Sequence, residues 1–208
     1  DTLILYTSDH GEFLGDHHAG AKSFFHEPSA HIPYVLRLPK CWDDRQAGAV
    51  VATPVTHADI LPTFLAAAGD APPAEVDGLN LIALARGELE HPRQYLEAMA
   101  GSMAEPTHLS MTDGRWKYMY YPEGAVEQLF DLATDPLELH NLVGLPDYED
   151  KWEELHRLMI QRHEARRSPY VAEGRLISLP LRGDTTRERR NTSWPGYHTE
   201  FYSIDVRH

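Results

Sequence analysis

The stretch TSDHGEFLGD, from Thr7 to Asp16, is the most informative part of this sequence. It follows a short apolar run, Leu3 to Tyr6, whose composition predicts a buried strand. Asp9 and His10 therefore stand where a strand ends and a glycine-containing loop begins, the edge at which ligand and metal sites gather in open α/β sheets. A carboxylate beside an imidazole suits a divalent cation, although an Asp-His-Gly triplet by itself also occurs in ordinary polar turns.

The composition is that of a globular, acidic chain. Its 208 residues are 42% hydrophobic, and 32 acidic residues stand against 19 basic ones. This length is enough for one large domain, or for one domain with a subdomain. The acidic balance argues against wholesale binding to nucleic acid or anionic lipid, and no apolar run approaches the ~20 residues of a membrane span. We therefore expect a soluble, cytoplasmic or periplasmic protein with no nucleic-acid or membrane partner.

The single cysteine and the first residues bear on how the chain is used. Cys41 has no second cysteine to pair with, and we interpret it as a packed or idle thiol. The chain opens with Asp1-Thr2 directly before a predicted strand, and no signal peptide is visible. We interpret the chain as part of a longer protein, cut immediately before a sheet strand.

The N-terminal part of the chain has the pattern of an α/β structure. The segment DILPTFLAAA, Asp59 to Ala68, carries apolar residues at helical spacing and is followed by Gly69. Pro62 falls in its first turn, where the missing N–H is harmless. We expect strands at 3–8 and 32–38, a brief extended stretch at 50–54, and helices at 23–30, 59–68 and 79–86.

After residue 92 the pattern changes to short β-forming segments. They are separated by turn signals, of which Asp113-Gly114 is a strong hairpin signal. The pattern predicts an antiparallel sheet of about four strands, with a helix over 148–166 packed on it through one apolar face. Beyond Ser168 the periodicity fades, and the aromatic end at 194–206 favours a tail that wraps a neighbour. The strands are expected at 94–98, 108–112, 116–121 and 128–132, and the helix face consists of Trp152, Leu155, Leu158 and Met159.

Three blocks of sequence occur in an order that is typical of one family. The first is TSDHGEFLGDHHAGAKSFFHEPSAHIPYVLRLP, Thr7 to Pro39. The second is THADILPTFLAAAG, Thr56 to Gly69. The third, Asp113 to Leu142, contains DGRWKYMYY and LFDLATDPLELHNL. Together they resemble the second metal-binding segment, a helix and the C-terminal subdomain of the sulfatases, within the alkaline-phosphatase superfamily.

The resemblance implies an α/β fold. It is an alkaline-phosphatase-like sandwich, incomplete in this chain, with a small C-terminal antiparallel sheet packed by a helix. Residues 1–91 are then the C-terminal part of the catalytic domain and residues 92–167 the antiparallel-sheet subdomain. Residues 168–208 form an extended tail, through which we expect a homo-oligomer to be possible.

The resemblance also assigns site residues. Asp9 and His10 become metal ligands, and Lys22 becomes a catalytic residue that contacts the sulfate oxygens and neutralises charge on the leaving oxygen. His18 and His108 are expected to bind substrate. Asp oxygens suit Ca²⁺ or Mg²⁺, whereas an imidazole ligand leaves Mn²⁺ or Zn²⁺ open. The family's formylglycine is expected in an N-terminal half that this sequence lacks, since Cys41 is not followed two residues later by proline.

The function implied by the resemblance is metal-dependent hydrolysis of a sulfate monoester, on a small molecule or a saccharide. Two alternatives stay open. One is a phosphonate monoester hydrolase or phosphodiesterase of the same superfamily, with which His10 and the Asp-His-His loop are compatible. The other is a non-catalytic fragment, because the nucleophile segment is absent and the chain alone should be inactive.

The remaining polar residues of the three blocks are given structural roles. His17 is expected to orient the loop. His26 and His31, which flank Glu27, are expected either to be structural or to contact the residues that bind metal and substrate. His57 is expected to cap or pack. The acidic residues Asp131, Asp135 and Glu138 are expected in turns and caps, with Asp135-Pro136 as a helix start.

Overall fold

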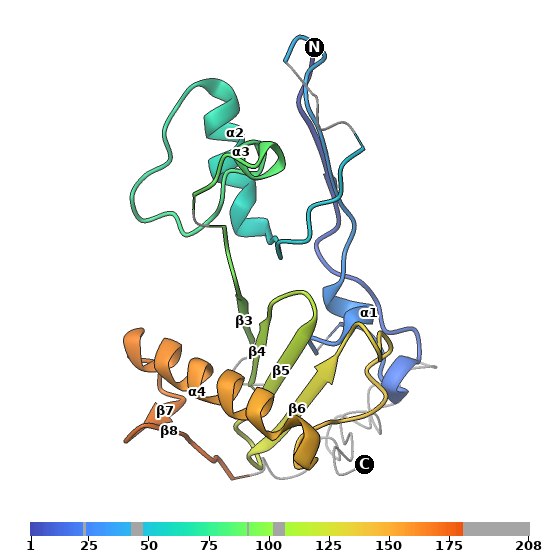
Figure 1. Ribbon diagram of the computed structural model, residues 1–208, viewed down its shortest axis with the longest axis vertical. Helices are drawn as coiled ribbons and strands as arrows, with labels where there is room; N and C mark the ends of the chain where they lie inside the picture. The colour runs from blue at the N-terminus through green and yellow to red at the C-terminus, as the bar shows by residue number, and fades with distance from the viewer. Residues whose placement is uncertain (23, 43–47, 91, 102–106, 181–208) are drawn as a thin grey trace, which may run out of the picture. The chain divides into compact units, whose positions relative to one another are not determined.

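The computed structural model describes the chain except residues 23, 43–47, 91, 102–106 and 181–208 (Figure 1). The chain divides into two compact units. Unit 1 contains Asp1–Asp9 and Ile32–Leu96, and unit 2 contains His10–His31 together with the described residues from Glu97 onward. The predicted domain boundaries at 91 and 167 remain predictions, and the apolar tail at 194–206 lies outside the described residues.

Unit 1 consists of a strand pair and two helices. β1 (Ile4–Thr7) and β2 (Tyr34–Arg37) pair antiparallel, with Leu5 opposite Leu36. The predicted helices are confirmed as α2 (Ile60–Ala68), which follows the 3₁₀ turn η2 (His57–Asp59), and α3 (Leu81–Arg86). Both helices end at a glycine with positive φ, 84° at Gly69 and 70° at Gly87, as a left-handed C-terminal cap requires.

The prediction that the strands at 3–8 and 32–38 are buried is wrong for this structure. Ile4, Tyr6 and Val35 are 44%, 64% and 57% exposed. In the part of the chain that the structure describes, β1 and β2 pair only with each other, and a two-stranded sheet lacks the neighbours that bury both faces. The stretch at 50–54 contains no strand.

Unit 2 is built around a four-stranded sheet in the order β3-β4-β5-β6. The predicted hairpin at Asp113-Gly114 is confirmed, with Gly114 at φ 94°. β5 pairs antiparallel with β4 on one side and β6 on the other, so that Lys117 lies opposite Phe130 and Met119 opposite Gln128. The strands are β3 (Leu96–Ala100), β4 (His108–Thr112), β5 (Trp116–Tyr121) and β6 (Val126–Asp131).

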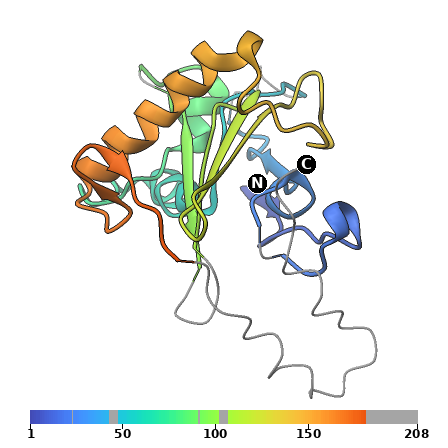
Figure 2. The same ribbon diagram turned by 90° about the horizontal axis from the view of Figure 1, so that it is seen from below.

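The two faces of this sheet have different partners. Met119 and Tyr121 of β5, with Phe130 of β6, form a core against which Phe24 and Phe25 pack. Side chains alternate along a strand, so Tyr118, which lies between Lys117 and Met119, points to the opposite face. On that face its hydroxyl lies 2.9 Å from His156 Nδ1 of the helix α4 (Glu149–Ala165). Figures 1 and 2 show α4 lying across the sheet on that face. The sheet therefore separates α4 from residues 10–31, which we call the loop.

The helix α4 is held to the sheet by an apolar row and one carboxylate. Leu155 and Met159 are fully buried, as the predicted apolar face requires. Glu127 of β6 accepts hydrogen bonds from the Tyr118 hydroxyl at 2.6 Å and from Trp152 Nε1 at 2.5 Å. A short hairpin follows α4, formed by β7 (Val171–Ala172) and β8 (Arg175–Leu176). This hairpin was not predicted from the sequence.

The loop contains less helix than predicted. Among the described residues of this loop, the helical segments are the 3₁₀ turn η1 (Asp16–His18) and the α-helix α1 (Glu27–Ala30). The helix predicted to start at Asp135-Pro136 is also absent, because Asp135 accepts a backbone hydrogen bond from His140 and closes a turn instead. Among the described residues, no helix combines the length and apolarity that crossing a bilayer requires.

Candidate functional site

Asp9 stands at the end of β1, as the sequence predicted. It is exposed, and its Oδ1 lies 3.4 Å from the Ser8 hydroxyl. The backbone next to it is fixed by His57, whose Nε2 lies 2.7 Å from the Ser8 carbonyl oxygen and donates to it. The predicted packing or capping role of His57 is thus a hydrogen bond to the strand end beside Asp9.

His10 and Lys22 are brought together in the loop. The Nδ1 atom of His10 lies 2.7 Å from the Gly11 carbonyl oxygen, which can only accept, so this nitrogen carries the proton. Nε2 then carries the lone pair and lies 2.5 Å from Lys22 Nζ, an ammonium that can only donate. The two residues are twelve positions apart in sequence, and the loop closes to make this contact.

The backbone of the loop is folded over a buried phenylalanine. Phe13 is fully buried, and its amide donates to the Ala21 carbonyl at 3.0 Å. The neighbouring Gly11 donates to the Ser29 carbonyl at 2.8 Å. A Cβ on Gly11 would lie 2.0 Å from the Pro28 carbonyl oxygen, so only glycine permits this approach. These contacts set the position of His10, which immediately precedes Gly11.

The two histidines predicted to bind substrate lie in different surroundings. His18 is exposed at the end of η1 with φ 55°. His108 is only 4% exposed, and its ring packs against Phe24 and Tyr121 at centroid distances of 4.9 and 5.1 Å. Burial lowers the pKa of His108 to about 4, so the ring is neutral at pH 7. Substrate binding by either residue stays a prediction.

Two further histidines of the loop pack against each other. The rings of His17 and His26 lie 4.4 Å apart, and His26 is 1% exposed. Burial, reinforced by the neighbouring His17, lowers the pKa of His26 to about 3. Both rings are therefore part of the loop's core, which agrees with the supporting roles predicted for them.

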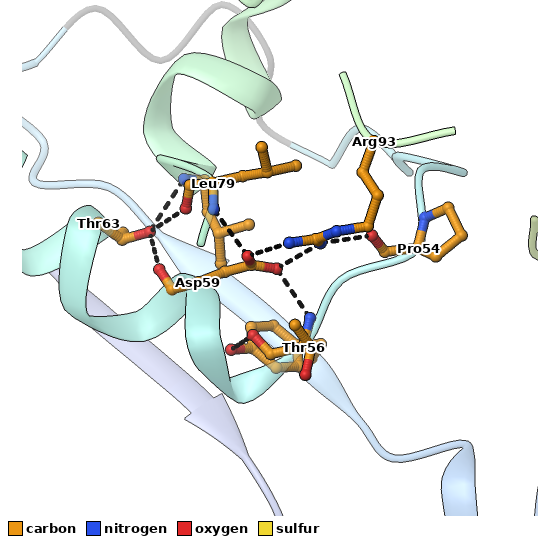
Figure 3. Close-up of polar contacts among 8 residues, drawn as sticks. Pro54, Thr56, Asp59, Thr63, Leu79 and Arg93 are labelled. Atoms are coloured by element: carbon orange, nitrogen blue, oxygen red, sulfur yellow. Dashed lines mark hydrogen bonds and ion pairs between the residues drawn. The ribbon is translucent and has the colours of Figure 1, made fainter. Parts of the chain in front are cut away.

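The most complete polar network in unit 1 surrounds Asp59 (Figure 3). Its carboxylate is fully buried and receives both terminal nitrogens of Arg93, at 2.7 and 2.9 Å. It also accepts the backbone amides of Thr56 at 2.8 Å and Leu79 at 2.7 Å. The sequence indicated a helix start at Asp59 but gave no sign of Arg93, because the pairing spans 34 residues. With every lone pair engaged, Asp59 serves the structure of unit 1.

A buried ion cluster around Lys117 in unit 2 was also not predicted from the sequence. Lys117 is 3% exposed and lies 2.5 Å from Glu27 Oε1 and 2.8 Å from Glu138 Oε1. Glu138, predicted as a turn or cap residue, does close a turn by donating its amide to the Asp135 carbonyl and also belongs to this cluster. The signal available in the sequence was the charged residue within the otherwise apolar strand WKYMYY, because a lysine is almost never buried without a partner.

The donor set for a cation is partial. A divalent cation needs a carboxylate and lone pairs, and Asp9 and His10 Nε2 supply both kinds. Across the described residues, no group of three or more His, Cys, Asp or Glu could hold a metal. The two donor types suit a site that needs further donors, and metal binding by Asp9 and His10 stays a prediction. Cys41 is not among them, since its thiol is exposed and lies outside the loop.

The sheet, its covering helix and most of the loop lie within the part of the chain that matches a sulfatase family. Residues 15–165 match the family described as N-sulphoglucosamine sulphohydrolase, C-terminal, and the chain belongs to this family, within the alkaline-phosphatase superfamily. The match confirms the predicted fold and family.

Individual relatives agree with this assignment. An arylsulfatase of Clostridium perfringens is 29% identical over 177 residues, covering 85% of this chain and 37% of that protein. The choline-sulfatase of Rhizobium meliloti is 35% identical over 149 residues, covering 70% of this chain and 28% of that protein. The chain thus spans well under half the length of the curated relatives it matches.

Solved structures show the same fold. A 2-O GAG sulfatase superposes with a TM-score of 0.68 at 26% identity, covering 81% of this chain and 37% of that one. The phosphonate monoester hydrolase of Agrobacterium radiobacter superposes with a TM-score of 0.65 at 30% identity, covering 86% of this chain and 39% of that one.

Proposed function

We propose that the protein carrying this chain hydrolyses sulfate monoesters of small molecules or saccharides. The observation that supports this most directly is the contact between His10 Nε2 and Lys22 Nζ, formed one residue from the Asp9 carboxylate. Family membership and the sulfatase relatives support the same reaction.

In this proposal Asp9 and His10 Nε2 hold a divalent cation, with Ca²⁺ favoured by the carboxylate and Mg²⁺ or Mn²⁺ as alternatives. When bound, the cation supplies positive charge near the ester oxygens. His10 keeps the required tautomer because Nδ1 donates to Gly11. Lys22 turns its ammonium from Nε2 to a sulfuryl oxygen, where it stabilises the charge that develops as the S–O bond breaks.

The attacking group lies outside this sequence in the proposal. Cys41 is followed by Trp-Asp-Asp-Arg and lacks the proline of a formylglycine segment, so a formylglycine is expected elsewhere in the protein. His18, exposed on the same loop as Lys22, is the candidate to contact the alcohol side of the substrate. The non-catalytic alternative predicts that no such segment accompanies this chain.

The second candidate function is hydrolysis of phosphonate monoesters or phosphodiesters. It is favoured by the 30% identity to a phosphonate monoester hydrolase across 86% of the chain. Sulfate monoesters carry one negative charge and phosphonate monoesters also carry one, so a site built from one lysine and one cation suits both.

The test is hydrolysis by the protein as its gene encodes it, assayed with an aryl sulfate, an aryl phosphonate monoester and an aryl phosphodiester in the presence of Ca²⁺ or Mn²⁺. We expect the sulfate to be cleaved with the highest kcat/KM. Lys22→Met should lower kcat by about 10²–10³-fold, the usual loss for one stabilising donor. Preference for the phosphonate selects the second function, and no turnover of any ester, or full activity in Lys22→Met and Asp9→Ala, contradicts the proposal.

A further inference from the structure

Lys117 is the centre of the contact between the sheet and the loop in unit 2. It lies on β5, on the face that packs against Phe24 and Phe25. Its ammonium donates to the Phe25 carbonyl at 2.9 Å and to Glu27 Oε1 at 2.5 Å, and it forms an ion pair with Glu138 Oε1 at 2.8 Å. The carbonyl and the two carboxylates around this ammonium compensate for burying its charge.

The carboxylates that meet Lys117 also hold the first turn of α1. Glu27 is the first residue of α1, and its backbone amide donates to Glu138 Oε2 at 2.6 Å. Glu138 adopts φ 55°, a left-handed conformation that costs a glutamate free energy and persists only where contacts enforce it. Burial raises the pKa of Glu138, while Lys117 counteracts that rise. Lys117 therefore favours the ionised form of this cap, and its ion pair helps to hold the cap in place.

From α1 the contacts lead to both halves of the candidate site. The Ser29 carbonyl accepts the Gly11 amide at 2.8 Å, next to His10. The Ser29 hydroxyl donates to the Lys22 carbonyl at 3.1 Å. One residue of α1 thus fixes the backbone at Gly11, next to His10, and at Lys22 itself.

We propose that Lys117 is a positioning residue: through Glu27 and Glu138 it fixes α1, and through Ser29 α1 fixes the His10–Lys22 pair. Its importance for hydrolysis rests on the proposed function, but the positioning itself concerns only contacts within unit 2. Lys117 touches no substrate in this proposal. Its role is to set where the Gly11 and Lys22 backbones lie.

The test measures amide hydrogen exchange by NMR on the whole chain, because exchange at Gly11 reports its hydrogen bond to Ser29 directly. Glu27→Ala removes the acceptor on α1 without leaving a buried charge alone, since Lys117 retains Glu138. We expect Gly11 to exchange about tenfold faster, the equivalent of one hydrogen bond. Glu27→Gln keeps an acceptor oxygen at the same place and should restore most of the protection.

A second pair of variants addresses Lys117 itself. Lys117→Met combined with Glu138→Gln removes both buried charges together, which cores usually tolerate. It should also accelerate exchange at Gly11, while the amides of β5 and β6 stay protected. The matched control is Arg115→Met with Asp131→Asn, which removes a neighbouring ion pair of the same sheet with 2.8 and 2.9 Å contacts. This control should leave Gly11 unchanged.

The outcomes separate the inference from the proposed function. Unchanged exchange at Gly11 in Glu27→Ala or in the Lys117 double variant, failure of Glu27→Gln to restore protection, or an equal effect in the Arg115 control each overturns the positioning role. If the protein hydrolyses no ester, the proposed function fails while the exchange experiment still decides on Lys117. If it does, the Lys117 double variant should lower kcat/KM by about tenfold, in proportion to the lost protection.

Discussion

Asp59 in unit 1 and Lys117 in unit 2 are both buried charges, yet they are satisfied in different ways. Asp59 faces one guanidinium and two backbone amides, so one negative charge meets one positive charge. Lys117 faces two carboxylates, so the cluster carries an excess negative charge, and burial raises the pKa of Glu138. The balanced cluster connects the start of α2 with Leu79 and Arg93. The unbalanced one depends on each partner and lies beneath the loop that presents His10 and Lys22.

The largest effect is expected from removing the cation of the balanced cluster. Arg93→Met leaves the fully buried Asp59 carboxylate without a counter-charge and should cost about 3–5 kcal/mol. Arg93→Lys keeps the positive charge but cannot bridge both carboxylate oxygens, so its loss of stability should be smaller than that of Arg93→Met. Hydrogen exchange of the α2 amides measures both losses. Equal protection in Arg93→Met and the wild-type chain would show that the network contributes little to unit 1.

The next effect concerns pH and distinguishes the buried histidines of unit 2 from exposed ones. His26 has its pKa lowered to about 3 when folded, so the unfolded chain binds its proton first. Stability from this residue is complete above the ordinary pKa of about 6.5 and is lost as pH falls towards 3, at up to about 1.4 kcal/mol per pH unit. His26→Leu should flatten the fall in urea-unfolding free energy between pH 6.5 and 4. His140→Ala, at a 79% exposed side chain, should not.

A smaller effect tests the close approach beneath His10. Gly11→Ala places a Cβ against the Pro28 carbonyl oxygen, a backbone atom that cannot move alone, and should destabilise unit 2 by about 1–3 kcal/mol. Gly20→Ala in the same loop meets nothing within 4 Å and should stay within about 0.5 kcal/mol. Urea unfolding followed by tryptophan fluorescence compares the two. Equal stabilities would mean that the close approach of Gly11 to Pro28 is not needed for the stability of unit 2.

The smallest effect returns to unit 1. Asn80 caps α3 by accepting the amides of Ile82 and Ala83 at 3.0 and 3.4 Å. Asn80→Ala should cost about 1 kcal/mol, whereas Asn80→Ser keeps an acceptor and most of the stability. Exchange of the α3 amides measures the difference. A loss as large as that in Arg93→Met would show that unit 1 depends on its helix caps as much as on its buried charge.

Local signals in the sequence predicted much of the fold. The strands at 108–112 and 116–121 were predicted with their exact bounds, because alternating apolar residues stand on either side of an Asp-Gly turn. The helices ending at Gly69 and Gly87 were predicted for the same kind of reason. What failed depended on distant partners. The burial of β1 and β2 needs neighbouring strands that local sequence does not reveal, and the ion pair of Lys117 with Glu27 joins positions 90 residues apart.

The candidate site was predicted from resemblance more than from pattern. The resemblance placed His10 and Lys22 in one site, and the structure brings their side chains into contact. The resemblance did not explain why His10 and Lys22 meet. Their contact depends on the backbone hydrogen bonds that Ser29 makes to Gly11 and Lys22. The burial of His108 was not foreseen either, since a histidine beside a threonine reads the same in sequence whether it faces solvent or two aromatic rings.

Because adjacent residues of β5 serve opposite faces, this strand limits how the family can change over evolutionary time. Lys117 belongs to the loop side and Tyr118 to the α4 side. Inserting or deleting one residue in β5 would exchange every inward and outward position beyond it. Homologous chains should therefore differ in β5 by substitution alone, and length changes should collect in the turn at Asp113-Gly114 and in the segment before Val126.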